Sequence, residues 1–162
     1  MDTRLPPGTV LDSDHWYDVL SAVFDPLNAR NDRELWGFTD DEYAAMTRGQ
    51  QAVFNLRWLR DYMEADTFLE YADDPALRQH ADRLVEDAAL IGAHAFIPVL
   101  AEIALIASNW HEPPDDALFD QVGPLESAFF SLEEKHGALF LFLADYVRRT
   151  PEEFIRPGGR SM

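Results

Sequence analysis

The sequence predicts an all-α fold. Apolar residues recur at intervals of three and four over most of the chain, the spacing that places them on one face of a helix. Alternating β-branched runs are absent, and so are the Asn-Gly and Asp-Gly pairs that close hairpins. The chain has 162 residues, close to the usual size of one domain, and 47% of them are hydrophobic. We therefore expect one domain over residues 1–162, a bundle of about six to eight helices with flexible ends at 1–11 and 156–162.

The first half of the chain predicts two long helices. Asp12 or Ser13 can cap a helix that extends to about residue 28 and is apolar on one side. After a connector at 31–38, Thr39 and Glu42 have the spacing of a capping box, and the helix that follows extends to about residue 65. Two apolar stripes give this helix a central position. The stripes are Ala45, Gly49, Ala52, Leu56, Leu59 and Met63, and Phe54, Trp58 and Tyr62.

Proline and glycine mark the helices of the second half. Pro75 suits the first turn of a helix capped by Asp73 or Asp74, and Gly92 ends that helix. The next predicted elements are a helix over about 95–108, with Pro98 near its first turn, and a loop at 109–114. A helix then begins at about 115 and bends near Gly123 and Pro124. The last predicted elements are a helix over 137–149 and one more turn at 151–155.

Segment 88–107 is almost entirely apolar and about as long as a membrane span. Polar and helix-breaking residues interrupt it, and its flanks are acidic, whereas basic residues usually anchor a span. We therefore expect two buried helices that meet near Gly92, and no membrane contact. The chain has no cysteine, and residues 1–10 lack the apolar run of a signal peptide, so we expect a cytoplasmic protein.

The net charge is −17, and the acidic residues are concentrated in two stretches. No lysine or arginine interrupts segment 61–74, and in segment 109–147 Lys135 is the single base. Concentrated negative charge costs stability through self-repulsion, repels nucleic acid and attracts basic partners. The carboxylates that we expect to contact a partner are Asp61, Glu64, Asp66, Glu70, Asp73 and Asp74 first, and Asp115, Asp116 and Asp120 second.

The sequence leaves three interpretations of this acidity open. A salt-adapted or GC-rich proteome yields acidic surfaces with no binding role, and charge runs are usually solvated faces. Carboxylates can also imitate the phosphates of DNA, so that a DNA-binding protein uses its lysines and arginines on this chain instead. A third interpretation is an acidic scaffold or immunity-type protein that recognises its partner by shape and apolar contacts.

Residues for catalysis or metal binding form no complete pattern. Nucleophile elbows, P-loops and dinucleotide-binding glycine motifs are absent. A di-metal bundle needs two Glu-x-x-His elements, and only Glu133 with His136 supplies one. Glu102 lies two turns after His94, and these two residues form the one plausible pair of a buried acid and a buried base. A small hydrolase or metal enzyme that uses Glu102, His94 or His136 is therefore the alternative, and we expect no catalytic residue, no metal and no cofactor.

Several short motifs appear in a defined order over about 40–154. They are Gln50 and Gln51 in the long helix, Leu90-Ile91-Gly92-Ala93 at a helix junction, Leu125 followed by Phe129 and Phe130, and Tyr146 followed by Pro151-Glu152-Glu153-Phe154. In this order the chain resembles the DNA-mimic protein family, which consists of small acidic all-helical bacterial proteins. The family's Asn-Gly-Gly-Phe element corresponds here to Ala65-Asp66-Thr67-Phe68, which keeps only the phenylalanine. Glycines permit a backbone turn that Asp66 and Thr67 make less easily.

The resemblance implies an all-α fold, a homodimer and an acidic face that occupies the DNA-binding site of a regulator. Together with the clustered charge, it predicts a non-enzymatic interaction module whose partner is a basic DNA-binding protein such as a transcription regulator. The residues of the two acidic stretches would stand where phosphates stand.

Overall fold

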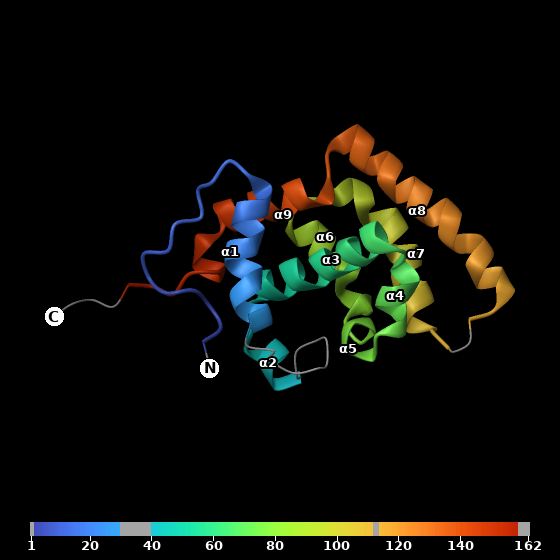
Figure 1. Cartoon of the computed structure of the whole chain (residues 1–162), viewed down its shortest axis with the longest axis horizontal. Coiled ribbons are helices and arrows are strands. Elements are labelled where there is room, and N and C mark those ends of the chain that lie inside the picture. Colours follow the sequence, from blue (N-terminus) through green and yellow to red (C-terminus); the bar gives the residue numbers. More distant parts are fainter. Residues whose placement is uncertain (1, 30–39, 112–113, 159–162) are drawn as a thin grey trace.

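Helices make up most of the chain in the computed structural model, which describes residues 2–29, 40–111 and 114–158 (Figure 1). The all-α prediction is confirmed: the described residues contain no strand, only an isolated bridge between Leu5 and Ile155. The α-helices are α1 (Trp16–Ala29), α2 (Asp40–Ala45), α3 (Arg48–Ala65), α4 (Phe68–Asp73), α5 (Pro75–Arg78), α6 (Leu84–Leu90), α7 (Ile97–Ser108), α8 (Asp116–His136) and α9 (Leu139–Arg149). Short 3₁₀ helices are η1 (Ala81–Arg83), η2 (His94–Phe96) and η3 (Pro151–Glu153).

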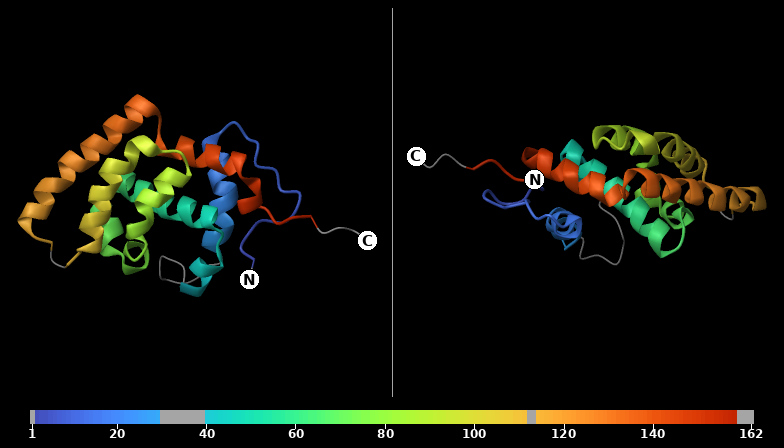
Figure 2. Two further views of the ribbon diagram at one scale, coloured as in Figure 1. Left: turned by 180° about the vertical axis from the view of Figure 1, so that it is seen from behind. Right: turned by 90° about the horizontal axis from the view of Figure 1, so that it is seen from above.

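Helix α3 is central, as its two apolar stripes predict. It contacts α4, α6 and α9, and residues 49–56 are all buried. Seen from above, α6 and α7 lie on one side of α3, and α1 and α4 lie on the other (Figure 2). Helix α8 forms an outer edge of the molecule, at the opposite end from α1 (Figure 1). Phe129 is its one buried residue, so most of α8 is available at the surface.

The predicted continuous helix from 39 to 65 is wrong, because the chain breaks between α2 and α3. Thr47 adopts an extended backbone there, and its hydroxyl accepts a hydrogen bond from Gln50 N at 3.1 Å. Gln50 Oε1 in turn accepts from Thr47 N at 3.0 Å, which completes a capping box at the start of α3. The predicted box of Thr39 and Glu42 falls partly on Thr39, which lies outside the described residues.

We expect Thr47→Ala to lower the free energy of unfolding by about 1 kcal/mol, because it removes the N-cap acceptor of the central helix. The Thr47 hydroxyl also donates to Glu153 O at 2.8 Å, so the cap joins α3 to η3. Chemical denaturation measures the loss, and Thr47→Ser, which keeps the hydroxyl, should recover most of it. An alanine variant as stable as the parent would show that the break does not depend on this cap.

The predicted helix from Pro75 to Gly92 is also divided. Asp74 caps α5 by accepting from Ala76 N at 2.9 Å, as predicted, but α5 ends at Arg78 and the chain tightens into η1 before α6 begins. The break brings the His80 ring onto Tyr43 of α2, with ring centroids 3.6 Å apart. Gly92 has a φ of +83° and ends this region as predicted.

Residues 3–5, within the segment 1–11 that we expect to be a flexible end, pack on the domain. Leu5 N donates to Phe154 O at 2.7 Å, and Arg156 N donates to Leu5 O at 2.9 Å. Thr3 is buried, and its hydroxyl donates to Gln50 Oε1 at 2.6 Å. These contacts fix residues 3–5 between η3 and the first turn of α3.

Segment 88–107 forms parts of α6 and α7 joined by a turn and η2, in agreement with the expected pair of helices. Across the described ranges, no helix combines the length and the apolar character that a membrane crossing needs.

Candidate functional site

Most arginines in the described part of the chain bind groups of the fold itself. Arg60 is the clearest case, because its Nε and its terminal nitrogen contact both oxygens of Glu133 at 2.9 to 3.1 Å. Few cations therefore remain to neutralise the exposed carboxylates. Other examples are Arg48 with Asp87, Arg83 with Gln51, Arg78 with Ala72 O, Arg148 with Ser13 O and Arg149 with Asp145.

Three of the six carboxylates predicted in segment 61–74 serve the fold. Asp61 lies 3.6 Å from Arg57 Nε, and burial raises the pKa of its carboxyl. Glu64 lies 3.3 Å from a terminal nitrogen of Arg60. Asp74 caps α5, and burial raises its pKa above the ordinary value. These three side chains are poorly suited to a partner's cations because the chain already uses them.

The other three, Asp66, Glu70 and Asp73, are exposed and make no ion pair within the described residues. Together with Trp110 and Phe119 they line a cavity of about 390 Å³, which we call the acidic–aromatic cavity. Its remaining lining residues are Thr67, Leu69 and Pro114.

The turn between α3 and α4 places these carboxylates. Asp66 ends α3 with a φ of −155°, Thr67 caps α4 in an extended conformation with a φ of −153°, and neither residue has the positive φ that favours glycine. This turn therefore needs no glycine, in contrast to the expectation from the Asn-Gly-Gly-Phe element. Glu126 of α8 accepts from the Thr67 hydroxyl and from Phe68 N, both at 2.8 Å. Helix α8 is thus tied to the first turn of α4, with the cavity beside the junction.

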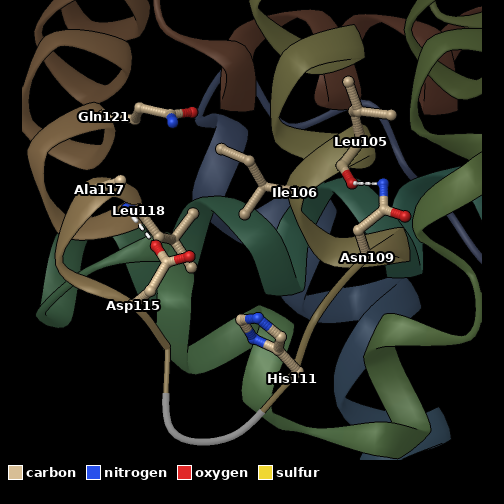
Figure 3. Close-up of a pocket in the computed structure, with 8 residues that line it drawn as sticks. All are labelled: Leu105, Ile106, Asn109, His111, Asp115, Ala117, Leu118 and Gln121. Carbon is tan, nitrogen blue, oxygen red and sulfur yellow. Dashed lines mark hydrogen bonds between the residues drawn. The ribbon is translucent and has the colours of Figure 1, made fainter.

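The second predicted group, Asp115, Asp116 and Asp120, lies at the start of α8 and is exposed. Asp115 caps the helix, because its carboxylate accepts from Leu118 N at 2.8 Å. It lines a second hollow of about 270 Å³ beside the apolar side chains of Ile106 and Leu118 (Figure 3). Residues of segment 109–121 line both hollows, so the two hollows flank the start of α8. Asp66, Glu70 and Asp73 thus line one of these hollows, and Asp115 lines the other.

A buried polar cluster joins α3 and α6, and sequence reasoning missed it. Asp87 has no exposed side-chain surface and pairs with Arg48, while Asn55 Nδ2 donates to Asp87 at 2.9 Å and to the Tyr43 hydroxyl at 2.9 Å. Burial raises the pKa of Asp87, and burial also lowers the pKa of His80, which stacks on Tyr43. The cluster holds helices together and lines neither of the two hollows.

The acid and base pair considered for an enzyme is not buried. His94 and Glu102 are both exposed, because the apolar face of α7 that contains Ile103 and Ala107 turns Glu102 toward solvent. Glu102 instead lines a shallow groove of about 520 Å³ between α7 and α8, together with Lys135. His136 is exposed, and its spaced partner Glu133 is bound to Arg60. Across the described ranges, no three acidic or histidine side chains gather as a metal site would require.

The described surface thus belongs to an all-α protein with carboxylates and aromatic rings around one helix junction. No protein-family model, curated protein or solved structure matches the chain. The site is therefore interpreted from its own chemistry.

Proposed function

We propose that this protein is a non-enzymatic interaction module whose acidic face occupies the DNA-binding surface of a basic partner such as a transcription regulator. The observation that carries the proposal is the position of Asp66, Glu70 and Asp73. These carboxylates are exposed, share one cavity and make no ion pair in the described part of the chain. They form the binding face together with Asp115, Asp116 and Asp120 at the start of α8.

Electrostatic cost supports a binding role. Asp61 and Glu64 form ion pairs within the fold, and Asp74 caps a helix. Of the six carboxylates of the binding face, Asp115 alone caps a helix, and none forms an ion pair within the described residues. Like charges at this density repel one another and lower stability. A partner that supplies lysine or arginine relieves the repulsion, just as such residues replace counterions on DNA.

Neutralising the cavity carboxylates should weaken partner binding by about tenfold, since three exposed ion pairs at about 0.5 kcal/mol each are lost. The variant carries Asp66→Asn, Glu70→Gln and Asp73→Asn, which keep side-chain shape. The partner is captured from a lysate of the source organism with the full chain, and its binding is measured against salt and against competing duplex DNA. We expect binding to weaken as salt rises, since screening shortens the reach of exposed charges to about 8 Å at physiological ionic strength. We also expect slower association for the variant.

The matched control removes three charges elsewhere, with Asp25→Asn, Glu102→Gln and Glu134→Gln, at exposed positions on α1, α7 and α8. It should bind nearly as well as the parent. Equal weakening in both triple variants would mean that net charge alone attracts the partner. Full binding by the cavity variant, or no competition from DNA, would contradict mimicry and favour recognition by shape and apolar contacts.

A further inference from the structure

We propose that the acidic–aromatic cavity is an anchor for one arginine side chain, whose guanidinium binds against Trp110 and Phe119 under the carboxylates of Asp66, Glu70 and Asp73. The inference rests on the proposed function in one respect, namely that the arginine comes from the basic partner. It adds a specific contact to an otherwise diffuse acidic face.

The cavity has an apolar wall as well as an acidic rim. Phe119 is 54% exposed although it is a large hydrophobic side chain, and Trp110 is only partly buried. Neither ring packs against another aromatic ring of the described residues. Exposed aromatic rings beside unpaired carboxylates attract a cation, because the ring face is negative and the carboxylates are charged.

The same protein binds its own arginines with this combination of groups. The guanidinium carbon of Arg60 lies 5.0 Å from the Phe130 ring centre and 5.1 Å from that of Phe140, and its nitrogens contact Glu64 and Glu133. In this internal site, the carboxylates contact the nitrogens of the guanidinium while two aromatic rings lie close to its carbon.

Arg57 repeats the pattern on a smaller scale, with its guanidinium carbon 4.3 Å from the Phe24 ring centre and its Nε 3.6 Å from Asp61. The acidic–aromatic cavity offers the same two kinds of group, and no cation of the described part of the chain lines it. Its carboxylates and rings are therefore free for a cation from outside.

Arginine fits this site better than lysine or a metal ion. Its planar guanidinium stacks on aromatic faces and binds carboxylates through several N–H groups, whereas a lysine ammonium is a compact and strongly hydrated charge. A metal ion would gain nothing from Trp110 and Phe119, which supply no ligand atom for it. A cavity of about 390 Å³ falls within the size range of small-ligand sites.

The test titrates the full chain with N-acetyl-arginine methylamide and follows the indole N–H signal of Trp110 by NMR, assigned with Trp110→Phe. We expect a saturable shift of this signal. The citrulline analogue has the same shape without the charge, and it should give no saturable shift. The corresponding lysine analogue should bind more weakly than arginine. A lysine analogue that binds as well as arginine would contradict stacking on the rings.

Variants separate the ring from the charge. Phe119→Leu keeps an apolar wall without a π face and should weaken arginine binding about threefold. Glu70→Gln with Asp73→Asn should weaken it about fivefold. Glu134→Gln, on an exposed part of α8 away from the cavity, should leave binding unchanged. All these positions are exposed, so folding is retained. A Glu134→Gln effect as large as that of the cavity variants, or no shift at Trp110, would overturn the anchor.

This titration needs no partner, so the two proposals fail separately. If arginine binds at Trp110 but no basic partner competes with DNA, the anchor stands and mimicry is contradicted. If a partner competes with DNA but arginine gives no shift at Trp110, mimicry stands and the anchor is contradicted.

Discussion

Glu133→Ala should lower the free energy of unfolding by about 3 kcal/mol, the largest loss expected from any single change considered for this protein. Glu133 of α8 is 9% exposed and binds Arg60 of α3, which is 11% exposed. Its carboxylate also accepts from Leu139 N at 2.7 Å, at the start of α9. Removing it leaves a nearly buried guanidinium and a backbone N–H without their acceptor, and three helices lose a common contact.

Glu134→Ala is the matched control, because the neighbouring glutamate is exposed and makes no ion pair in the described residues. It should change stability by less than about 0.5 kcal/mol. Both variants remove one negative charge, so a difference measured by urea denaturation reports position and not charge. Equal effects would show that Glu133 acts only through the overall field, and would contradict a structural role for its pair with Arg60.

The helices of this fold could be predicted because their apolar periodicity is local. Where they break was only partly predictable: Thr47 and Gln50 have the local spacing of a capping box, whereas other contacts at the breaks come from distant residues. Thr47 ends the link between α2 and α3 partly through Glu153, more than 100 residues later. His80 lies in the break after α5 because its ring stacks on Tyr43. A cap is visible in sequence when its partners are neighbours, as Thr47 and Gln50 are, whereas the contact of Thr47 with Glu153 is not.

The candidate site was predictable in its charge but not in its composition. Counting carboxylates located both acidic groups, yet it could not separate Asp61, which has a partner one turn away, from Glu70, which has none. Arg57 and Asp61 are four residues apart, and this spacing on a helix predicts an ion pair between them. The charge pattern does not single out Trp110 and Phe119, although Phe119 stands among Asp115, Asp116 and Asp120.

Asp87 was missed although it shares the helical face of buried residues. Leu84, Ala88 and Ile91 are buried at positions i, i+4 and i+7, and Asp87 at i+3 lies on the same face. An acid within an apolar stripe indicates a buried polar partner, which here is Asn55 together with Arg48.

Asp87→Ala should lower the free energy of unfolding by about 2 kcal/mol, because Asn55 Nδ2 and Arg48 lose a buried acceptor. The loss is smaller than for Glu133 because Arg48 is 35% exposed and water can replace part of the contact. Glu86→Gln is the control: Glu86 is 75% exposed and lies 3.9 Å from the same arginine, so its loss should be within about 0.5 kcal/mol. Two equal losses, measured by urea denaturation, would show that burial of Asp87 does not matter.

The same residue should make the protein more stable as the pH falls from neutrality toward 3.8. Burial raises the pKa of Asp87 above its ordinary value of 3.8, so the folded state takes up a proton at a higher pH than the unfolded chain. Its contribution to stability therefore grows as the pH falls through the folded-state pKa and is complete below 3.8. The raised pKa values of Asp61 and Asp74 act in the same direction.

His80 acts in the opposite direction, because burial lowers its pKa below 6.5 and the unfolded chain takes up that proton first. We expect the three carboxylates to outweigh it as the pH falls toward 3.8, and Asp87→Asn to reduce the gain in stability on acidification. The asparagine is accommodated because Asn55 Oδ1 has no hydrogen-bond partner in the described structure and can accept from a new amide after the Asn55 side chain flips. The same flip would accommodate a protonated Asp87. A gain on acidification that is unchanged in Asp87→Asn would mean that the exposed carboxylates, and not this buried acid, set the pH dependence of the fold.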